Sequence, residues 1–364
     1  MKVHPRQPIL TLAVTAFAIL GFTTTSASAQ IIIDDTLPVL IAVGNQGTTG
    51  LAIVASYDAS RSDKLVVVVS TEHAHGINAG MSINSVEYNG RAMIEAVQEN
   101  TIPGTAAIFY LDSPGPAGEI RIFQGNQNGG RATVYALSSV APGLGGFGQS
   151  ITNSVDVITT SPNELVIACI LDGGQAANGN GAGAPTAALP LIQDHSGTWG
   201  RSWGGHGAGH QFIASPGIAT STFTTAGPNL LRNVAVAFHE CTARTVNYGA
   251  GLAGTNGVPT LTTSAPPVFG QSISLQGSNS SGVVASGLLI TGLQSISVPF
   301  LGGMLLADTT ILTPMVIPAG GFSLPVTIPT IPCGLAVYLQ ALQLDQAAVA
   351  GVSMSPGLRL VPGR

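Results

Sequence analysis

The sequence predicts an all-β protein of two antiparallel β-sandwich domains, of the jelly-roll or Ig-like type, after a cleaved signal peptide. Three observations support this prediction. Glycine (47 residues) and proline (23) are abundant, whereas aromatic residues make up only 5% of the chain. Short runs rich in Val, Ile, Tyr and Phe recur along the sequence, and several alternate apolar with polar residues. No long segment repeats apolar residues at the i, i+3, i+4, i+7 spacing of an amphipathic helix.

Residues 1–29 are predicted to be the signal peptide. Two basic residues, Lys2 and Arg6, precede a mostly apolar run over 9–22, and Ala27-Ser28-Ala29 has the small-residue pattern of a cleavage site. The apolar run is shorter than the ~20 residues of a membrane span. Glycines and prolines interrupt the later apolar runs, so no membrane span is expected. The sequence therefore predicts export by a Sec-type pathway and a secreted or cell-surface protein.

Residues 30–240 are predicted to form the N-terminal β-sandwich domain. Nine strand-like runs, from LAIVASY to NVAVAFH, are separated by turn sequences. Asn89-Gly90 is a strong hairpin signal, because a type I′ turn needs positive φ at both central residues. The stretch 113–116, Ser-Pro-Gly-Pro, cannot continue a strand and predicts a loop. A glycine-rich stretch over 173–209 predicts a long loop with a functional role or high mobility.

Residues 241–364 are predicted to form a C-terminal β-sandwich domain. Strand-like runs recur there, and the segment has only five charged side chains: Arg244, Asp308, Asp345, Arg359 and Arg364. Cys241 and Cys333 bracket this domain, and a disulfide between them is favoured over two unpaired thiols. Cys169 lies in the strand-like run ELVIACIL and is expected to be a buried free thiol.

Several motifs carry a resemblance to a known kind of protein. YGAGLAGTNGVPTL (248–261), PFLGGMLL (299–306), CGLAVYLQALQLD (333–345) and SPGLRL (355–360) resemble a C-terminal β-sandwich module of secreted bacterial proteins of unknown function. SVEYNGRAMIEAV and AIFYLDSPGPAGEIRI are similar to an exported β-sandwich module that sometimes precedes it. The resemblance implies no catalytic residues. Such modules often carry a cysteine where this chain has Leu252.

The charge composition excludes one class of partner. Charged residues are 8% of the chain and its formal net charge is −5. Nucleic-acid binding requires clustered Lys and Arg, which the sequence lacks. We therefore expect no nucleic-acid partner, while the low charge leaves self-association open.

The stretch GRSWG (200–204) matches the G-x-S-x-G motif of a hydrolase nucleophile elbow. That motif needs a buried strand before its serine and a helix after it. Here polar residues precede Ser202 and glycines follow it, so the favoured interpretation is a loop serine. The sequence contains no coherent catalytic set, and we expect a protein that is not an enzyme.

The segment 195–212 offers two candidate binding sites. His195, His206 and His210 could ligate zinc if one loop folded around the ion, although exposed loop histidines are the favoured alternative. A calcium ion held by Asp58 and Asp63, with Asp34 and Asp35, is a further possibility, and turn capping is favoured over it.

Trp199, Arg201 and Trp203 are the residue types of a sugar-binding surface, because indole rings stack on pyranose rings. The favoured alternative is that both indoles anchor the loop to the sandwich.

These observations predict an exported, non-enzymatic structural or binding protein of the cell surface or extracellular material. Its partners would be an extracellular glycan or a surface protein. The alternative is a carbohydrate-binding protein that uses residues 195–212. The second alternative is a metal-dependent hydrolase.

Overall fold

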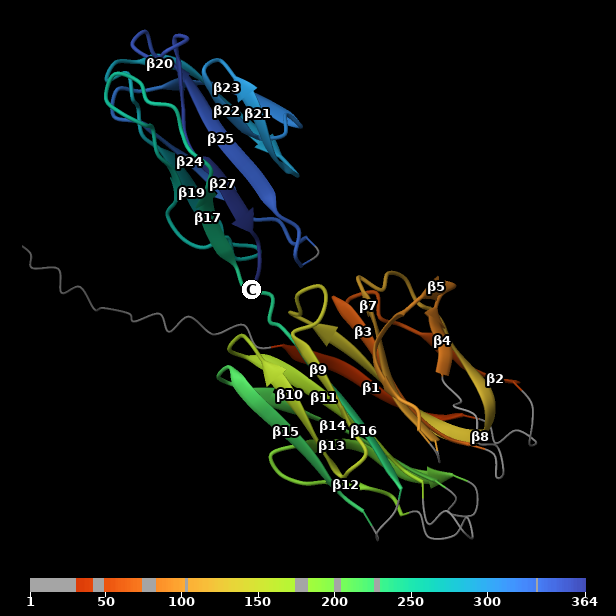
Figure 1. Cartoon of the computed structure of the whole chain (residues 1–364). Coiled ribbons are helices and arrows are strands. Elements are labelled where there is room, and N and C mark those ends of the chain that lie inside the picture. The colour runs from red at the N-terminus through yellow and green to blue at the C-terminus, as the bar shows by residue number, and fades with distance from the viewer. Residues whose placement is uncertain are drawn as a thin grey trace, which may run out of the picture.

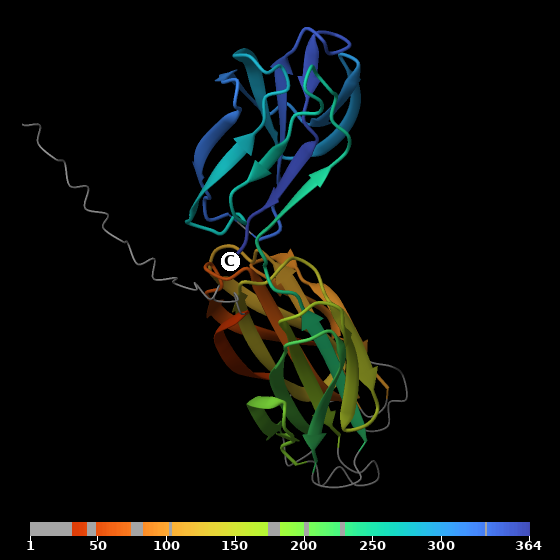
Figure 2. The same ribbon diagram turned by 90° about the vertical axis from the view of Figure 1, so that its left-hand side faces the viewer.

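The computed structural model describes residues 31–41, 49–73, 83–101, 104–173, 183–199, 204–225, 230–331 and 333–364. In these residues the elements are strands, and their pairings are antiparallel, which confirms the predicted all-β class. Figure 1 shows two lobes, one in red to green and one in cyan to blue. A view turned by 90° shows the same division (Figure 2). None of the described residues forms a helix that could span a membrane.

The first part of the N-terminal lobe, residues 31–139, is called unit 1. Its strands are β1 (Ile32–Ile41), β2 (Thr49–Tyr57), β3 (Lys64–His73), β4 (Ile83–Tyr88), β5 (Arg91–Ala92), β6 (Ile94–Glu99), β7 (Gly104–Asp112) and β8 (Gly118–Ser138). The first half of the long strand β8 pairs with β2 and β4, and its second half pairs with β1 and β3. The predicted Asn89-Gly90 turn joins β4 to β5, with φ values of 49° and 74°.

The second part, residues 140–240, is called unit 2. Its strands are β9 (Gly146–Ser150), β10 (Ser154–Thr159), β11 (Glu164–Asp172), β12 (Thr186–Ala187), β13 (Ile192–Trp199), β14 (Gly204–Ile213), β15 (Gly217–Thr224) and β16 (Leu231–Phe238). One sheet has the order β13-β14-β11-β16-β9, and a smaller sheet has the order β10-β15-β12.

Units 1 and 2 share one topology. The sheet β6-β7-β3-β8-β1 matches β13-β14-β11-β16-β9 strand for strand, and β2-β8-β4 matches β10-β15-β12. Chain order agrees too, with β8 corresponding to β15 and β16 together. Both units place Ser-Pro-Gly at the same turn, at 113–115 and 215–217. The expectation of one sandwich over 30–240 is therefore wrong: this segment holds two related sandwiches. The sequence patterns did not reveal this repeat, because corresponding strands of the two units share apolar character rather than identical residues.

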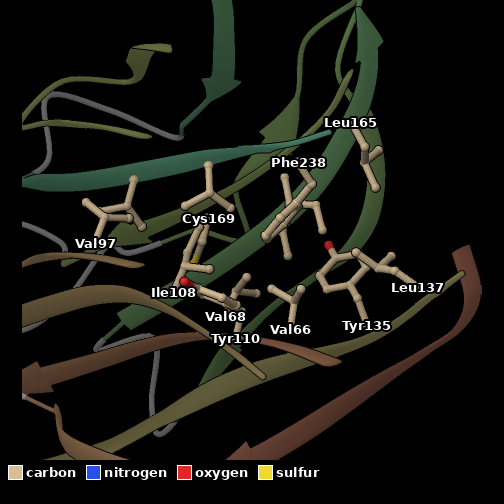
Figure 3. Close-up of a cluster of buried hydrophobic side chains, with 14 of the residues drawn as sticks. Val66, Val68, Val97, Ile108, Tyr110, Tyr135, Leu137, Leu165, Cys169 and Phe238 are labelled. Atoms are coloured by element: carbon tan, nitrogen blue, oxygen red, sulfur yellow. The ribbon is translucent and has the colours of Figure 1, made fainter. Parts of the chain in front are cut away.

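The two larger sheets, called the inner sheets, pack face to face. A continuous apolar cluster joins them, with Val66, Ile108 and Tyr135 from unit 1 against Leu165, Cys169 and Phe238 from unit 2 (Figure 3). The rings of Tyr110 and Phe238 meet edge to face with centroids 6.3 Å apart. Each unit also has its own core, between its inner sheet and its smaller sheet. Both faces of each inner sheet are thus buried, which explains the nearly unbroken apolar runs of β3 and β11.

Strand β14, GGHGAGHQFI, corrects the prediction of a loop over 173–209. Among the described residues of that range, β12, β13 and the start of β14 are strands. A Cβ atom at Gly205 would lie 2.0 Å from the Gly183 carbonyl oxygen, and one at Gly207 would lie 3.1 Å from the Phe223 ring. These glycines serve close packing on one face of a strand. The alternate residues, His206, Ala208 and His210, occupy the other face, toward unit 1.

The C-terminal lobe is a third sandwich. Its strands are β17 (Arg244–Tyr248), β18 (Leu261–Thr263), β19 (Ser272–Gly277), β20 (Ala285–Gly292), β21 (Ser295–Phe300), β22 (Gly303–Ala307), β23 (Ile311–Ile317), β24 (Phe322–Thr327), β25 (Val337–Leu344), β26 (Val352–Met354) and β27 (Gly357–Val361). The sheet β17-β27-β25-β20-β23 faces the sheet β18-β19-β24 across an apolar core. Pro314 lies in β23 and Pro325 in β24, which are edge strands in the described structure. Proline lacks the N–H that strand addition there would need.

Replacing Phe238 with alanine tests the packing of the inner sheets. Phe238 is fully buried, so Phe238→Ala should lower the free energy of unfolding of the N-terminal lobe by about 3–5 kcal/mol. Phe147 belongs to the same sheet but is 62% exposed, so Phe147→Ala should change it by no more than about 0.5 kcal/mol. Urea denaturation of both variants measures the difference. Equal effects would contradict the assigned packing.

Candidate functional site

One of the three predicted sugar-binding residues, Trp199, lies at the end of the β13–β14 ladder. Trp199 is the last residue of β13 and pairs with Gly204 of β14. Arg201 and Trp203, with Ser202, lie outside the described residues. At the base of this hairpin, Arg131 of β8 donates a hydrogen bond from Nε to the Thr198 carbonyl oxygen at 3.0 Å. Unit 1 thus holds the base of the segment predicted to bind glycans.

His206 is buried between the two inner sheets and joins them by hydrogen bonds. Its Nε2 lies 2.9 Å from Thr133 Oγ1 of β8, and its Nδ1 lies 2.9 Å from Ser70 Oγ of β3. Ser70 Oγ donates to the Ile170 carbonyl oxygen, at 3.1 Å. Ser70 therefore accepts from Nδ1–H, and Thr133 donates to Nε2. This assignment uses both ring nitrogens of a neutral imidazole.

Burial keeps both His206 and Cys169 in their neutral forms at neutral pH. Burial, with the nearby Arg131 and His195, lowers the pKa of His206 to about 3. Burial also raises the pKa of Cys169 to about 12, which outweighs the opposite effect of its hydrogen bond with Ser70. The thiol lies 3.9 Å from His206 Nδ1, but a catalytic cysteine must be a thiolate. Cys169 is a buried free thiol, as predicted, and this cysteine–histidine contact is not a nucleophilic pair at neutral pH.

His210 belongs to a second polar cluster at the same interface. Its Nδ1 lies 2.8 Å from Asp194 Oδ1, and Tyr135 donates its hydroxyl proton to Asp194 Oδ2 at 2.9 Å. Burial first, and then the Asp194 carboxylate, raise the pKa of Tyr135 well above its usual value of 10. The Asp194 carboxylate thus connects His210 of unit 2 to the buried Tyr135 of unit 1.

The three predicted zinc ligands do not form a metal site. His206 uses both ring nitrogens in hydrogen bonds within the protein, and His210 is bonded to Asp194. Within the described part of the chain, which includes His195, no group of three or more His, Cys, Asp or Glu residues is placed to hold a metal ion. The expected alternative of exposed loop histidines is also wrong for His206, which is only 1% exposed. Alternate residues of a strand face opposite sides, so His206 and His210 of β14 both face unit 1.

Cys241 and Cys333 form a disulfide, as the sequence favoured. Cys241 is anchored to unit 1 by a hydrogen bond from its N–H to the Ser139 carbonyl oxygen at 2.8 Å. Its own carbonyl oxygen accepts the N–H of Arg364, at 3.0 Å. The bridge therefore closes the C-terminal sandwich at the point where the chain leaves the N-terminal lobe.

A polar cleft of about 590 Å³ lies beside this disulfide and is lined in part by Cys241. Its charged and titratable lining comprises His239, Glu240, Arg244 and Arg359. His239 Nδ1 lies 3.1 Å from Oε1 of the fully buried Glu164, which also accepts the N–H groups of Thr160 at 2.8 Å and Ser161 at 2.6 Å. Burial raises the pKa of Glu240, against a hydrogen bond from Asn163.

The cleft is the site that sequence reasoning missed. Two atoms of its lining residues, Glu240 Oε1 and Arg359 Nε, are buried without a hydrogen-bond partner. Such atoms could bind a polar ligand, with the guanidinium groups as donors and the carboxylates as acceptors. His239 Nδ1 lies near the Glu164 carboxylate but forms no hydrogen bond in the described structure, so the two residues lack the aligned contact of an acid–base triad. No sequence signal could have found the cleft, because its residues come from five separate segments.

The low pKa of His206 predicts a pH-dependent stability. A histidine of the unfolded chain has a pKa of about 6.5 and therefore takes up its proton first as the pH falls. The contribution of neutral His206 to stability is complete above about pH 6.5 and is lost as the pH falls toward 3. His206→Gln should weaken this dependence, measured as the change in urea midpoint between about pH 7 and about pH 4.5. An equally steep loss in the variant would contradict the assignment.

Thiol titration tests the cysteine assignments. The native protein should show no reactive thiol, because Cys169 is buried and the other two cysteines are joined. Denaturant should expose one thiol, and reduction in denaturant should give all three. Cys241→Ser with Cys333→Ser should destabilise the C-terminal lobe by about 2–5 kcal/mol. Three reactive thiols in denaturant without reductant would refute the pairing.

Comparison with known proteins adds no family to this description. A scan against protein-family models finds no match, and a search of curated proteins finds no similar chain.

Proposed function

We propose that this is an exported, non-enzymatic structural or binding protein of the cell surface or extracellular material. The main support is the use made of its buried polar groups. His206, Asp194 and His210 hold the two inner sheets together. A disulfide closes the third sandwich, as is typical of oxidising compartments. These features favour a rigid scaffold of three sandwiches over a reaction centre.

A metal-dependent hydrolase is not proposed. His195, His206 and His210 would have to converge on one ion, and no such group is found among the described residues. His206 in particular would have to leave a fully satisfied buried position to bind zinc.

Carbohydrate binding is the second candidate. Its support is the register of β13 and β14, which pairs Trp199 with Gly204 at the end of their ladder. Arg131 holds the backbone beside that end through its hydrogen bond to the Thr198 carbonyl oxygen. A rigid scaffold that fixes the position of its binding residues is a common arrangement for recognition.

N-terminal sequencing tests the export proposal. The protein recovered from the culture medium or cell surface of a bacterial host should begin at Gln30, following cleavage after Ala29. A variant with Ala27→Tyr and Ala29→Tyr should keep its leader, because bulky residues block signal cleavage. Intracellular wild-type protein that begins at Met1 would contradict export.

A glycan array tests the second candidate. Trp199→Ala with Trp203→Ala should abolish binding, because each indole provides a stacking face for a sugar ring. Phe147→Ala, which removes another exposed aromatic ring of unit 2, is the matched control and should bind like the wild type. Unchanged binding by the double variant would refute this role for the tryptophans.

A further inference from the structure

Lys64 is the only lysine after residue 2, and its side chain is completely buried. Full burial is rare for this residue type. Lys64 lies at the start of β3, in direct register with Asp112 at the end of β7. Its Nζ contacts Asp112 Oδ1 and donates a hydrogen bond to the Gly143 carbonyl oxygen at 3.0 Å. Among the described residues, Asp112 is the carboxylate within ion-pair distance of Nζ.

Two aromatic rings cover the amine. Nζ lies 4.7 Å from the ring centroid of Tyr110 and 5.2 Å from that of Phe238, which comes from unit 2. Burial lowers the pKa of Lys64, although Asp112 and Asp63 act in the opposite direction. A desolvated amine of this kind is a stronger nucleophile than an exposed lysine, because more of it is neutral.

Both carboxylate oxygens of Asp112 are held by a contact with a neighbouring residue. Oδ1 contacts the lysine, while Oδ2 accepts the N–H of Gly143 at 2.9 Å. Gly143 therefore aligns both partners, with its carbonyl oxygen on the amine and its N–H on the carboxyl group. A backbone N–H in this position also stabilises negative charge that develops on Oδ2. The side chain of Asp112 is 29% exposed, which leaves a route to solvent for a small leaving group.

We propose that Lys64 and Asp112 condense into an intramolecular amide that cross-links β3 to β7. The neutral amine attacks Cγ of the protonated carboxyl group, these forms arising by proton transfer within the ion pair. The Nζ–Cγ bond forms, and negative charge collects on Oδ2 beside the Gly143 N–H. The Cγ–Oδ1 bond then breaks, and Oδ1 leaves as water. Of the three ammonium protons, one stays on the amide nitrogen and two leave with the water. No oxidant, cofactor or second substrate is needed.

Proximity makes this reaction reasonable without an enzyme. The two groups are held in contact by the register of neighbouring strands, so attack is intramolecular, which can raise effective concentrations by many orders of magnitude. The alternative is a buried ion pair that stays ionic. Such pairs are weak contributors to stability, because desolvation offsets much of the attraction.

Mass spectrometry of the purified protein tests the proposal. Under reducing and denaturing conditions, the intact mass should be lower than the sequence mass of the purified chain by one water. Trypsin should leave the bond after Lys64 uncut, because an acylated lysine is no longer a substrate. The digest should contain a branched peptide in which residues 62–91 are joined to residues 92–121.

Three variants make the test specific. Lys64→Arg and Asp112→Ala should each restore the full sequence mass, since one reacting group is missing. Asp112→Asn should lose ammonia in place of water and reach the same final mass as the cross-linked wild type. Should a variant fail to fold, the wild-type mass and digest still decide the question. A wild-type protein of full mass, with tryptic cleavage after Lys64, would overturn the proposal.

Discussion

The face-to-face burial of the two inner sheets is the constraint on which the N-terminal lobe depends. Each inner sheet has its own sandwich core on one face and its partner sheet on the other. Any polar side chain on the shared faces must therefore find a partner across the seam, because an unpaired buried group is costly. His206, Asp194 and Lys64 satisfy this requirement through Thr133, Tyr135 and Gly143 of the opposite unit.

This constraint also explains why residues that suggest chemistry are mostly structural. A histidine beside a thiol and hydroxyls resembles a catalytic set, yet burial holds the imidazole and the thiol in their neutral forms. Catalysis needs groups whose pKa values lie near the working pH. Two lining residues of the cleft beside the disulfide, Glu240 and Arg359, do have buried polar atoms without hydrogen-bond partners.

The sequence alone determined the all-β class, several turns and the content of the strands. Asn89-Gly90 specifies the turn from β4 to β5 through local backbone geometry, whereas most of RAMIEAV enters β6, which pairs with β7. Within the strand-like run LAVYLQALQL, residues Val337–Leu344 form β25. The Cys241–Cys333 pairing was favoured from composition and compartment, but its geometry is a property of the folded chain.

Only the tertiary structure decided which face each strand presents and what lies against it. GGHGAGH was predicted to be a loop because glycine disfavours strands, but close packing against Gly183 and Phe223 requires glycine at alternate positions. That packing turned His206 and His210 inward, where each forms hydrogen bonds within the protein. The repeat of units 1 and 2, the Lys64–Asp112 contact and the cleft all depend on residues far apart in sequence. Local patterns carry no information on such contacts, since burial across sheets is set by the whole fold.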